Sequence, residues 1–470
     1  MNLRITPQQL HGAITPPASK SQAHRLIMGA ALAGGSSVLR SVSGSNDITA
    51  TLGCMEALGA KSKQLDDTTL QITGNAGNSA PASQVLDCGE SGSTLRFLIP
   101  IALALTGDVT FRGHGRLMQR PQTPYFEIFQ EKGIEYHLEG DLLTVRGALT
   151  PGQYSLRGDV SSQFITGLLY ALPLLHGDSD IVLTTQLESE SYVNLTLDAL
   201  RQFGITIVST AQGWHIPGNQ AYTGHDLAVE ADYSQSGFFY AAQGIGNPVS
   251  VTGMNPDSMQ GDRIILPYMD KLNSTGLVDL DVRDCPDLVP PLALRAALRD
   301  GETTVISNAA RLRLKESDRL ASVTAVLGAM GANIDEGPDS LTIHGTASLQ
   351  GGVTVDSWGD HRIAMMAAMA ATVCREPITL TGAESVRKSY PGFWELRSND
   401  EKYLWQCCFD DHFRREPRPG HRRGAGGCSV RHFHGHGLHR RRTPPPCHRK
   451  QPSVHPSEGS GSGGGALRRV

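Results

Sequence analysis

Apolar and polar positions recur along the chain in one order: helix, glycine, strand, turn, strand. Short amphipathic helices are predicted at 51–60, 125–133, 195–204 and 322–331, each ending at or beside a glycine. A strand with alternating apolar residues follows each helix, at 70–74, 142–147, 214–218 and 340–345. Residues 264–283 give a looser copy. Repeats of roughly 65–75 residues with this content are typical of small α/β subdomains.

Each repeat also contains an earlier and more apolar helix. These helices are predicted to begin near residues 21, 91, 161, 232, 290 and 360, which gives six repeats. Stretches such as 97–105 and 363–371 are apolar nearly all round, so we expect them to be buried. Their N-terminal ends are polar, which indicates six helix ends that converge on one cleft. The fold class is therefore α/β, built from repeated βα units with buried helices.

The first apolar helix, predicted over 26–33, indicates what such an end can bind. Ser19 or Ser21 can cap its start, and Lys20 and Arg25 add two positive charges beside its free N–H groups. A helix N-terminus of this composition suits an anion such as phosphate. A capped surface helix with two solvated cations is the alternative. It does not explain why further arginines stand at or near the other ends: Arg96, Arg319 and Arg362.

The formal net charge of −4 hides two unlike segments. Residues 1–400 carry 28 Lys and Arg against 41 Asp and Glu, whereas residues 401–470 carry 14 against 5. An acidic body argues against a general nucleic-acid surface, so its cations should serve a local purpose. No apolar run reaches the ~20 residues of a membrane span, and no signal-peptide core is visible. Scattered cysteines without metal-ligand spacing suit a reducing cytoplasm, where we expect the protein.

Eight short motifs occur in order across residues 1 to about 394. They are KSQAHR at 20–25, GESGSTLR at 89–96, LMQRP at 117–121, SSQF at 161–164, CPDLVP at 285–290, RLRLKESDR at 311–319, DHR at 360–362 and RKSYP at 387–391. In this order they closely resemble the motifs of the 5-enolpyruvylshikimate-3-phosphate synthase family, the 3-phosphoshikimate 1-carboxyvinyltransferases. One such motif is weak evidence, whereas eight in family order are specific.

The resemblance implies a two-domain enolpyruvyl transferase fold, with three of the repeated units in each domain and a cleft between the domains. It implies a first domain of residues 1–18 plus 225–398 and a second domain of residues 19–224. The family normally ends soon after Trp394. Residues 399–470 are biased towards His, Arg, Pro and Gly and lack apolar periodicity, so we expect a disordered tail. We interpret this tail as the product of a shifted reading frame.

The family transfers the enolpyruvyl group of phosphoenolpyruvate to the 5-hydroxyl of shikimate 3-phosphate and releases phosphate, through a tetrahedral intermediate. This reaction belongs to the shikimate pathway, which leads to chorismate and the aromatic amino acids. The family needs no metal and no organic cofactor. The resemblance therefore implies a monomeric transferase that acts on two small molecules, with no nucleic-acid or membrane partner. Both substrates are polyanions, and arginine suits carboxylates and phosphates because it binds them bidentately.

The resemblance also assigns the site residues to two overlapping sets. Shikimate 3-phosphate is expected to contact Lys20, Ser21, Arg25, Ser161, Ser162, Gln163, Ser189, Tyr192, Asp287 and Lys315. Phosphoenolpyruvate is expected to contact Lys20, Gly92, Arg120, Gln163, Arg319, Arg362 and Lys388. No residue is assigned to a metal. Without ligand, we expect the cations of the two domains to repel one another and to hold the cleft open.

The reacting hydroxyl must lose a proton and the enolpyruvyl methylene must gain one, which calls for a base and an acid in a closed site. The resemblance gives Asp287 the role of base on the sugar hydroxyl. It leaves the methylene and phosphate proton transfers among four candidates: Lys20, Glu316, His361 and Lys388. Structural roles are the alternative, with Glu316 in an ordinary helix N-terminus and Asp287 in a turn.

Two other functions stay open at this point. The sister enolpyruvyl transferase that acts on UDP-N-acetylglucosamine has the same architecture. It typically carries a loop cysteine near the position of 117–120, where this sequence has none. A non-catalytic anion-binding protein on the same scaffold is the second alternative, but it would not need Asp287, Glu316 and His361 together.

Overall fold

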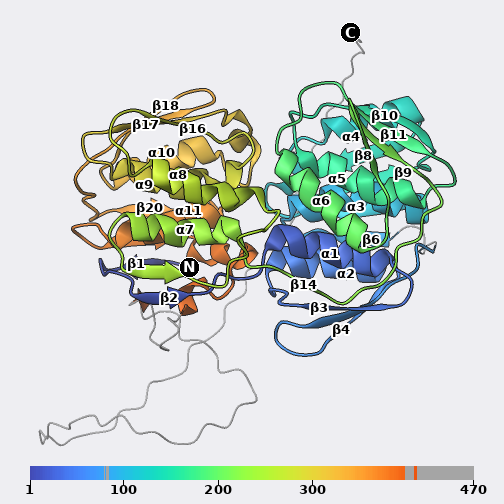
Figure 1. Cartoon of the computed structure of the whole chain (residues 1–470), viewed down its shortest axis with the longest axis horizontal. Coiled ribbons are helices and arrows are strands. Elements are labelled where there is room, and N and C mark those ends of the chain that lie inside the picture. The colour runs from blue at the N-terminus through green and yellow to red at the C-terminus, as the bar shows by residue number, and fades with distance from the viewer. Residues whose placement is uncertain (79, 81–83, 397–406, 410–470) are drawn as a thin grey trace, which may run out of the picture. The chain divides into compact units, whose positions relative to one another are not determined.

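The structure is a computed structural model that describes residues 1–78, 80, 84–396 and 407–409 (Figure 1). Its buried hydrophobic side chains form two separate clusters. One cluster and its packed neighbours define a first lobe of residues 18–229. The other defines a second lobe of residues 1–14 and 233–396. Helices and sheets alternate in both lobes, so the predicted α/β class is confirmed.

Three four-stranded sheets with the same pattern of strand pairing build the first lobe. In the middle sheet of the sequence, β6 runs parallel to β7, β7 pairs antiparallel with β9, and β8 completes the sheet beside β9. The other two sheets repeat this order as β14–β3–β5–β4 and β10–β11–β13–β12. The strands are β3 (Ser36–Arg40), β4 (Lys61–Gln64), β5 (Leu70–Thr73), β6 (Gln84–Asp87), β7 (Asp108–Arg112), β8 (Glu135–Glu139), β9 (Leu142–Arg146), β10 (Gly152–Leu156), β11 (Ser179–Leu183), β12 (Val208–Thr210), β13 (Gly213–Ile216) and β14 (Leu227–Ala228). The helices are α1 (Lys20–Leu32), α2 (Asn46–Ala57), α3 (Gly92–Thr106), η1 (Leu117–Gln119), α4 (Thr123–Lys132), α5 (Ser162–Ala171), η2 (Leu172–Leu174) and α6 (Glu190–Gln202).

The second lobe contains the sheets β16–β17–β19–β18 and β20–β21–β1–β22 and the parallel pair β15–β2. Its strands are β1 (Leu3–Ile5), β2 (Gly12–Ile14), β15 (Val249–Val251), β16 (Val278–Asp281), β17 (Thr303–Ser307), β18 (Asn333–Glu336), β19 (Leu341–His344), β20 (Thr354–Asp356), β21 (Ile378–Thr381) and β22 (Cys407–Phe409). Its helices are α7 (Tyr233–Gly244), η3 (Gly261–Ile264), α8 (Ile265–Lys271), η4 (Pro286–Leu288), α9 (Val289–Ala297), η5 (Ala310–Leu314), α10 (Arg319–Ala329), α11 (His361–Ala371), η6 (Ala383–Lys388) and η7 (Phe393–Glu395). The described residues thus hold six sheets, one for each predicted repeat.

One helix of each repeat is buried along most of its length, as predicted: α1, α3, α5, α7, α9 and α11. Five of these helices start with a side-chain cap, from Ser19, Ser91, Ser161, Asp232 or Asp360. The first helix was predicted to begin near residue 21 with Ser19 or Ser21 as its cap, and it begins at Lys20, directly after the Ser19 cap. The polar residues at 22, 24 and 25 are buried at the start of this helix, ahead of its apolar body at 26–33.

The chain passes between the lobes at two segments that lie side by side. Ser19 N–H donates to the Glu230 carbonyl at 2.7 Å, and Asp232 N–H donates to the Pro17 carbonyl at 2.9 Å. The second passage was predicted at residue 225. However, β14 pairs with β3, and Val229 still belongs to the first cluster, so the passage comes a few residues later. The assignment of the two lobes as separate domains stays a prediction.

The predicted tail overlaps the described residues in one place. Cys407–Phe409 forms β22, which pairs antiparallel with β1. The expectation of disorder is therefore wrong for these three residues, because β1 has an edge with backbone groups free to pair. The rest of 399–470 lies outside the described residues. None of the described helices has the length and apolar character needed to cross a membrane.

His24 is a buried titratable group in the core of the first lobe. Its Nδ1 lies 2.7 Å from Thr51 Oγ1, and its Nε2 has no hydrogen-bond partner among the described residues. The ring packs edge-on against Phe97. Burial lowers the pKa of His24 to about 3, with Lys20 and Arg25 acting in the same direction and Asp47 against it. The imidazole is therefore neutral in the folded protein.

Replacing His24 with Met should reduce the loss of stability in mild acid. The unfolded chain binds a proton at this position below about pH 6.5, whereas the folded chain does not. The contribution of the neutral imidazole to the free energy of unfolding is therefore fully present above pH 6.5. It is lost as the pH falls from 6.5 towards 3. The loss amounts to at most about 1.4 kcal/mol per pH unit. Urea unfolding of the wild type and of His24→Met at pH 7 and pH 5 measures this loss of stability. Equal losses in the two proteins would contradict the lowered pKa of His24.

Candidate active site

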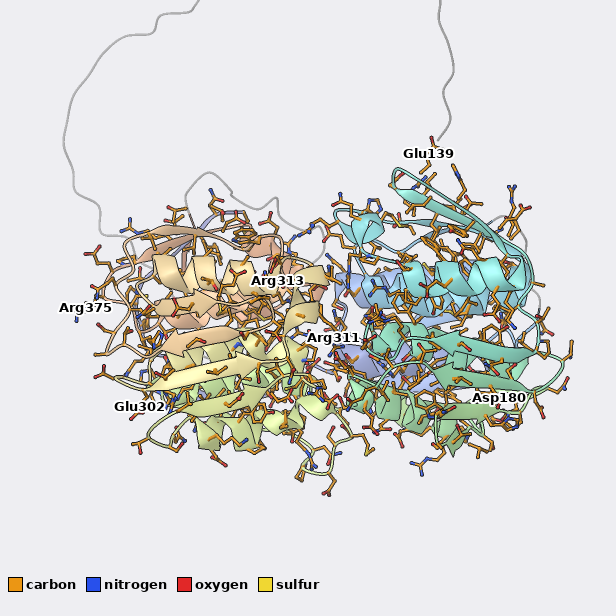
Figure 2. The ribbon with its side chains drawn as sticks, turned by 90° about the horizontal axis from the view of Figure 1, so that it is seen from above. Glu139, Asp180, Glu302, Arg311, Arg313 and Arg375 are labelled. Carbon is orange, nitrogen blue, oxygen red and sulfur yellow. The ribbon has the colours of Figure 1, made fainter. Side chains whose placement is uncertain are left out.

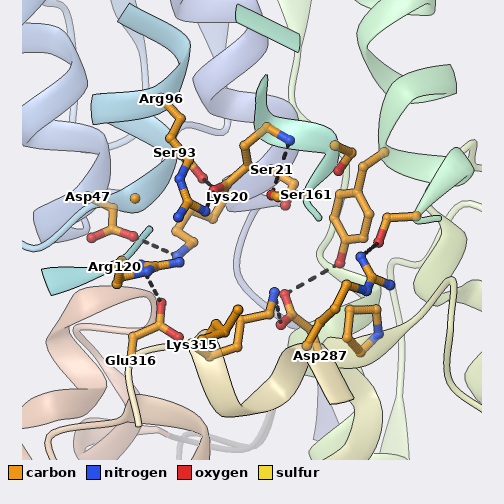
Figure 3. A pocket seen from close by; sticks show the side chains of 18 of the residues that line it. Lys20, Ser21, Asp47, Ser93, Arg96, Arg120, Ser161, Asp287, Lys315 and Glu316 are labelled. Carbon is orange, nitrogen blue, oxygen red and sulfur yellow. Dashed lines mark hydrogen bonds and ion pairs between the residues drawn. The ribbon is translucent and has the colours of Figure 1, made fainter. Parts of the chain in front are cut away.

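A polar pocket lies where the N-terminal ends of the buried helices meet (Figure 3). Of the predicted site residues, all except Lys388 line this pocket. The first lobe contributes the starts of α1, α3 and α5 and the residue after η1. The second lobe contributes η4, the segment between η5 and α10, and the start of α11. The start of α7 does not line the pocket, since its cap Asp232 instead accepts from the Lys20 N–H at 3.0 Å.

The guanidinium of Arg319 joins three carboxylates at the floor of the pocket. Its Nε donates to Asp360 at 2.8 Å, Nη1 to Asp287 at 2.7 Å and Nη2 to Glu316 at 2.6 Å. The Arg319 side chain is only 1% exposed. Burial by itself would lower the pKa of this guanidinium, but the three negative charges outweigh burial and raise the pKa. Arg319 therefore stays charged and fixes the positions of the two acids proposed for chemistry.

Asp287 is surrounded by positive charge. Besides Arg319, Arg362 Nη2 lies 2.8 Å and Lys315 Nζ 3.6 Å from its carboxylate, and the Tyr192 hydroxyl lies 3.4 Å away. Burial raises the pKa of the Asp287 carboxyl, but Arg362, Lys315 and Arg319 outweigh it and hold the pKa well below its usual range. Burial lowers the pKa of Lys315 to about 8, against the opposing charge of Asp287. Asp287 is thus an ionised carboxylate at neutral pH.

Glu316 faces cations from both lobes. Beyond its Arg319 contact, its carboxylate lies 4.0 Å from Arg120 Nη1 and 3.8 Å from Lys388 Nζ. Burial raises the pKa of the Glu316 carboxyl, but the charges of Arg319, Lys388 and Arg120 lower it well below the usual value. Nearby, His361 Nδ1 is bonded to the Ser389 hydroxyl. Burial, assisted by Arg362 and Lys20, lowers the pKa of His361 well below its usual range, so this imidazole is neutral.

The start of α3 allows Arg120 to approach closely. A Cβ atom on Gly92 would lie 2.5 Å from Arg120 Nη1, so any larger residue there would displace the guanidinium. The Nε of Arg120 has no partner among the described residues, which leaves this buried cation donors for a ligand. Gln163 is held from both ends, since its Nε2 donates to Ser93 at 3.0 Å and its Oε1 accepts from Arg96 at 2.9 Å.

Arg25 was predicted as a substrate contact, and three of its five N–H donors already bond to the protein. Its Nε donates to Thr196 at 2.8 Å, and Nη1 and Nη2 donate to the carbonyls of Ser21 and Tyr192 at 2.6 and 3.0 Å. Burial lowers the pKa of Arg25 to about 10. Lys20 is paired as well, with its Nζ 2.7 Å from Asp47.

Sequence reasoning assigned no ligand contact to several lining residues: Asp47, Ser93, Arg96, Phe97, Pro121, Val160, Pro286, Arg311 and Leu314. Arg96 and Arg311 belong to recognised motifs, so their positions could have been included from the sequence. Arg311 lies at the junction of the lobes (Figure 2), where its Nη1 donates to Ser189 at 3.0 Å. Asp47 belongs to none of the eight motifs. Only the packing of α2 against α1 brings its carboxylate to Lys20.

The expected repulsion across the cleft is offset by carboxylates that the prediction did not consider. Arg120 of the first lobe faces Glu316 of the second at 4.0 Å, and Lys388 of the second lobe faces Glu90 of the first at 3.7 Å. Opposite charges therefore meet across the cleft in the absence of ligand. The described residues contain no group of three or more His, Cys, Asp or Glu side chains that could hold a metal ion.

A family model described as EPSP synthase (3-phosphoshikimate 1-carboxyvinyltransferase) matches residues 5–396. This chain belongs to the EPSP synthase family. The 3-phosphoshikimate 1-carboxyvinyltransferase of Clostridium kluyveri is 45% identical over 410 residues, covering 83% of this chain and 95% of the relative. That of Clostridioides difficile is 41% identical over 421 residues, covering 84% of this chain and 96% of the relative. The resemblance seen in the eight motifs is confirmed.

Solved structures agree with the family assignment. EPSP synthase from Acinetobacter baumannii superposes with a TM-score of 0.70 at 26% identity, covering 87% of this chain and all of that chain. The enolpyruvyl transferase NikO from Streptomyces tendae has a TM-score of 0.67 at 17% identity, covering 84% of this chain and 96% of that chain. At that identity the second similarity shows the fold alone. The enolpyruvyl transferase architecture predicted for this EPSP synthase family member is thus confirmed.

Replacing Arg319 with Leu should destabilise the protein strongly. The substitution leaves three buried carboxylates without their shared cation, and breaking a buried ion pair costs about 3–5 kcal/mol. Urea unfolding at pH 7 measures the change. Arg313→Leu is the matched control, because its partners Asp318 and Glu336 are partly exposed and such pairs contribute about 1 kcal/mol or less. Equal effects of the two substitutions would refute the central role of Arg319.

Proposed function

We propose that this chain transfers the enolpyruvyl group of phosphoenolpyruvate to the 5-hydroxyl of shikimate 3-phosphate and releases phosphate, in agreement with its family, the 3-phosphoshikimate 1-carboxyvinyltransferases. The observation that supports this most strongly is the composition of the pocket. Cations from both lobes surround two ionised acids, Asp287 and Glu316, in one enclosed site. Two polyanionic substrates need such cations, and an addition–elimination reaction needs such acids.

Phosphoenolpyruvate is proposed to bind around Glu316 and Arg120. Arg120 has unused donors beside Gly92, and its guanidinium can bind a carboxylate or phosphate bidentately. Further contacts are proposed for Lys20, Gln163, Arg319, Arg362 and Lys388. A substrate bound there would connect the two lobes, since Arg120 belongs to one lobe and Lys388 to the other.

Shikimate 3-phosphate is proposed to bind beside Tyr192 and Asp287. Ser161 and Ser162 at the start of α5 offer hydroxyl and backbone N–H groups, which suit a phosphate. Lys315 supplies a positive charge next to Asp287. Further contacts are proposed for Lys20, Ser21, Arg25, Gln163 and Ser189. For Arg25, we propose a contact through the second N–H of a terminal nitrogen, since each terminal nitrogen makes one bond to the protein.

Asp287 is proposed as the base that takes the proton of the substrate hydroxyl. In the ligand-free site the neighbouring cations make it a weak base. Two anionic substrates would share those cations with Asp287, which raises its proton affinity when the hydroxyl is in place. Lys20, Glu316 and Lys388 are proposed to carry out the proton transfers of the enolpyruvyl methylene and of the phosphate. The neutral His361 is suited to donate a hydrogen bond rather than to supply a proton.

The decisive experiment measures phosphate release from phosphoenolpyruvate with two acceptors. Turnover is expected with shikimate 3-phosphate and not with UDP-N-acetylglucosamine. Reversed acceptor specificity would favour the sister transferase. Binding of both ligands without phosphate release would favour an anion-binding protein.

Asp287→Asn should abolish most turnover while the protein stays folded. The amide keeps the size of the side chain but cannot take a proton, and loss of a general base costs about 10²–10⁴-fold in kcat. Asp300→Asn is the matched control, because Asp300 is exposed and does not line the pocket. Thermal melting checks the fold of both variants. A near-normal kcat for Asp287→Asn would show that another group is the base.

Substituting cations at the two ends of the pocket should separate the substrates. Arg120→Met should raise KM for phosphoenolpyruvate far more than KM for shikimate 3-phosphate, and Lys315→Met should do the reverse. Loss of one charge-assisted contact corresponds to roughly 10–150-fold in affinity. Lys315 is a better probe than Arg25, whose removal would also break contacts within the protein. Steady-state kinetics with each substrate varied in turn measures both ratios, and equal effects would contradict the proposed division.

A further inference from the structure

Tyr192 separates the active-site pocket from a second, smaller cavity. Nine residues line this cavity: Ser19, Ser21, Ser191, Tyr192, Leu195, Ser234, Gln260, Gly261 and Asp262. It shares Ser21 and Tyr192 with the active-site pocket. It shares Ser191 and Gly261 with a groove that also includes the exposed Met259. A line of mostly polar residues therefore leads from the active site to the surface at Met259.

Asp262 is a buried acid in this cavity to which neither the family motifs nor the proposed reaction assigns a role. Only 3% of the residue is exposed. Its Oδ2 accepts from the Tyr192 hydroxyl at 3.2 Å and from the Ser234 hydroxyl, while Oδ1 has no hydrogen-bond partner among the described residues. No arginine or lysine of the described residues forms an ion pair with it. An ionised Asp262 is thus poorly compensated and has a free position for a proton.

The Tyr192 hydroxyl connects Asp262 to Asp287. Its oxygen lies 3.2 Å from Asp262 Oδ2 and 3.4 Å from Asp287 Oδ2, so one phenol contacts both carboxylates. Burial, together with the charges of Asp262 and Asp287, raises the pKa of Tyr192 well above its usual value. The phenol therefore stays protonated, and it can pass a proton on only if it receives another.

We propose that Tyr192 and Asp262 form a relay that carries the proton taken up by Asp287 away from the active site. The relay rests on the proposed function, because it takes Asp287 as the base. First, the O–H bond of the substrate breaks and its proton bonds to Asp287. The Tyr192 oxygen then accepts this proton while its own proton passes to Asp262. Asp287 regains its negative charge, Asp262 loses its charge, and Asp262 later releases the proton towards the second cavity.

The charges around the relay favour this direction. Burial raises the pKa of Asp262 to about 7, and Asp287 adds to this effect, while Ser234 and Arg362 oppose it. The pKa of Asp287 is far lower, so a proton is more stable on Asp262 than on Asp287. The titratable and charged groups that face Asp262 come from four parts of the chain: Tyr192 on α6, Asp232 before α7, Cys285 and Asp287 around η4, and Arg362 on α11.

The test is the pH profile of kcat for phosphate release, with both substrates saturating. In the wild type, kcat should rise with pH through about 7, because Asp262 accepts a proton only when it is ionised. Asp262→Asn has the same size but cannot take a proton. It should lose this rise and lower kcat at pH 8 by roughly 10²-fold. Both KM values should change little, since Asp262 does not line the substrate pocket.

Two further variants distinguish a relay from a purely structural role. Ser234→Ala removes a donor that stabilises ionised Asp262, so the rise in kcat should move to higher pH. Damage to packing alone would not produce a shift in that direction. Asp270→Asn, the same chemical change at an exposed position on α8, should leave both the profile and kcat unchanged.

The outcomes separate the relay from the proposed function. A folded Asp262→Asn variant that keeps the wild-type profile and kcat overturns the relay. If that variant fails to fold in a thermal melt, the Ser234→Ala profile decides, and an unmoved rise overturns the relay. If the wild type releases no phosphate from the two substrates, the proposed function fails, and the relay with it.

Discussion

The buried guanidinium of Arg319 is the contact on which the site depends. It holds Asp287, Glu316 and Asp360 at hydrogen-bond distance, and these carboxylates in turn position Arg362 and Lys315 and cap α11. A cation of this kind is stable only because three acids surround it, and the acids stay ionised only because of the cation. The ligand-free site is thus an interlocking set of opposite charges. Anionic substrates can enter by taking over contacts that the protein's own carboxylates already make.

The fold determines where the residues of the pocket lie. Six βα units each bury one helix, the polar starts of α1, α3, α5 and α11 line the pocket, and η4 before α9 adds Asp287. Their apolar bodies pack in the two hydrophobic cores, which positions the helix ends (Figure 1). Because the pocket draws its residues from both lobes, neither lobe contains the whole site. Binding and catalysis in this EPSP synthase family member therefore depend on how the lobes meet.

Much of this could be predicted from the sequence. The apolar bodies at 97–105 and 363–371 are hydrophobic on all sides, so their burial follows from composition alone. The start of α1 was predicted from its cap near residue 21, but the burial of the polar residues 22, 24 and 25 could not be predicted, because a hydrophobic pattern cannot mark such positions. Arg96 and Arg311 stood in recognised motifs, but their contacts with Gln163 and Ser189 join segments far apart in the chain.

The sequence by itself determined the repeated units, the buried helices, the family and most of the residues that line the pocket. These properties follow from local periodicity and from short motifs in a fixed order. Only the tertiary structure decided which charges are paired, because an ion pair such as Lys20 with Asp47 or Lys388 with Glu90 joins residues on different elements. The same holds for Asp262, whose neighbours come from α6, α7 and η4. Its elevated pKa is set by burial among distant residues, and no local pattern in the chain encodes that environment.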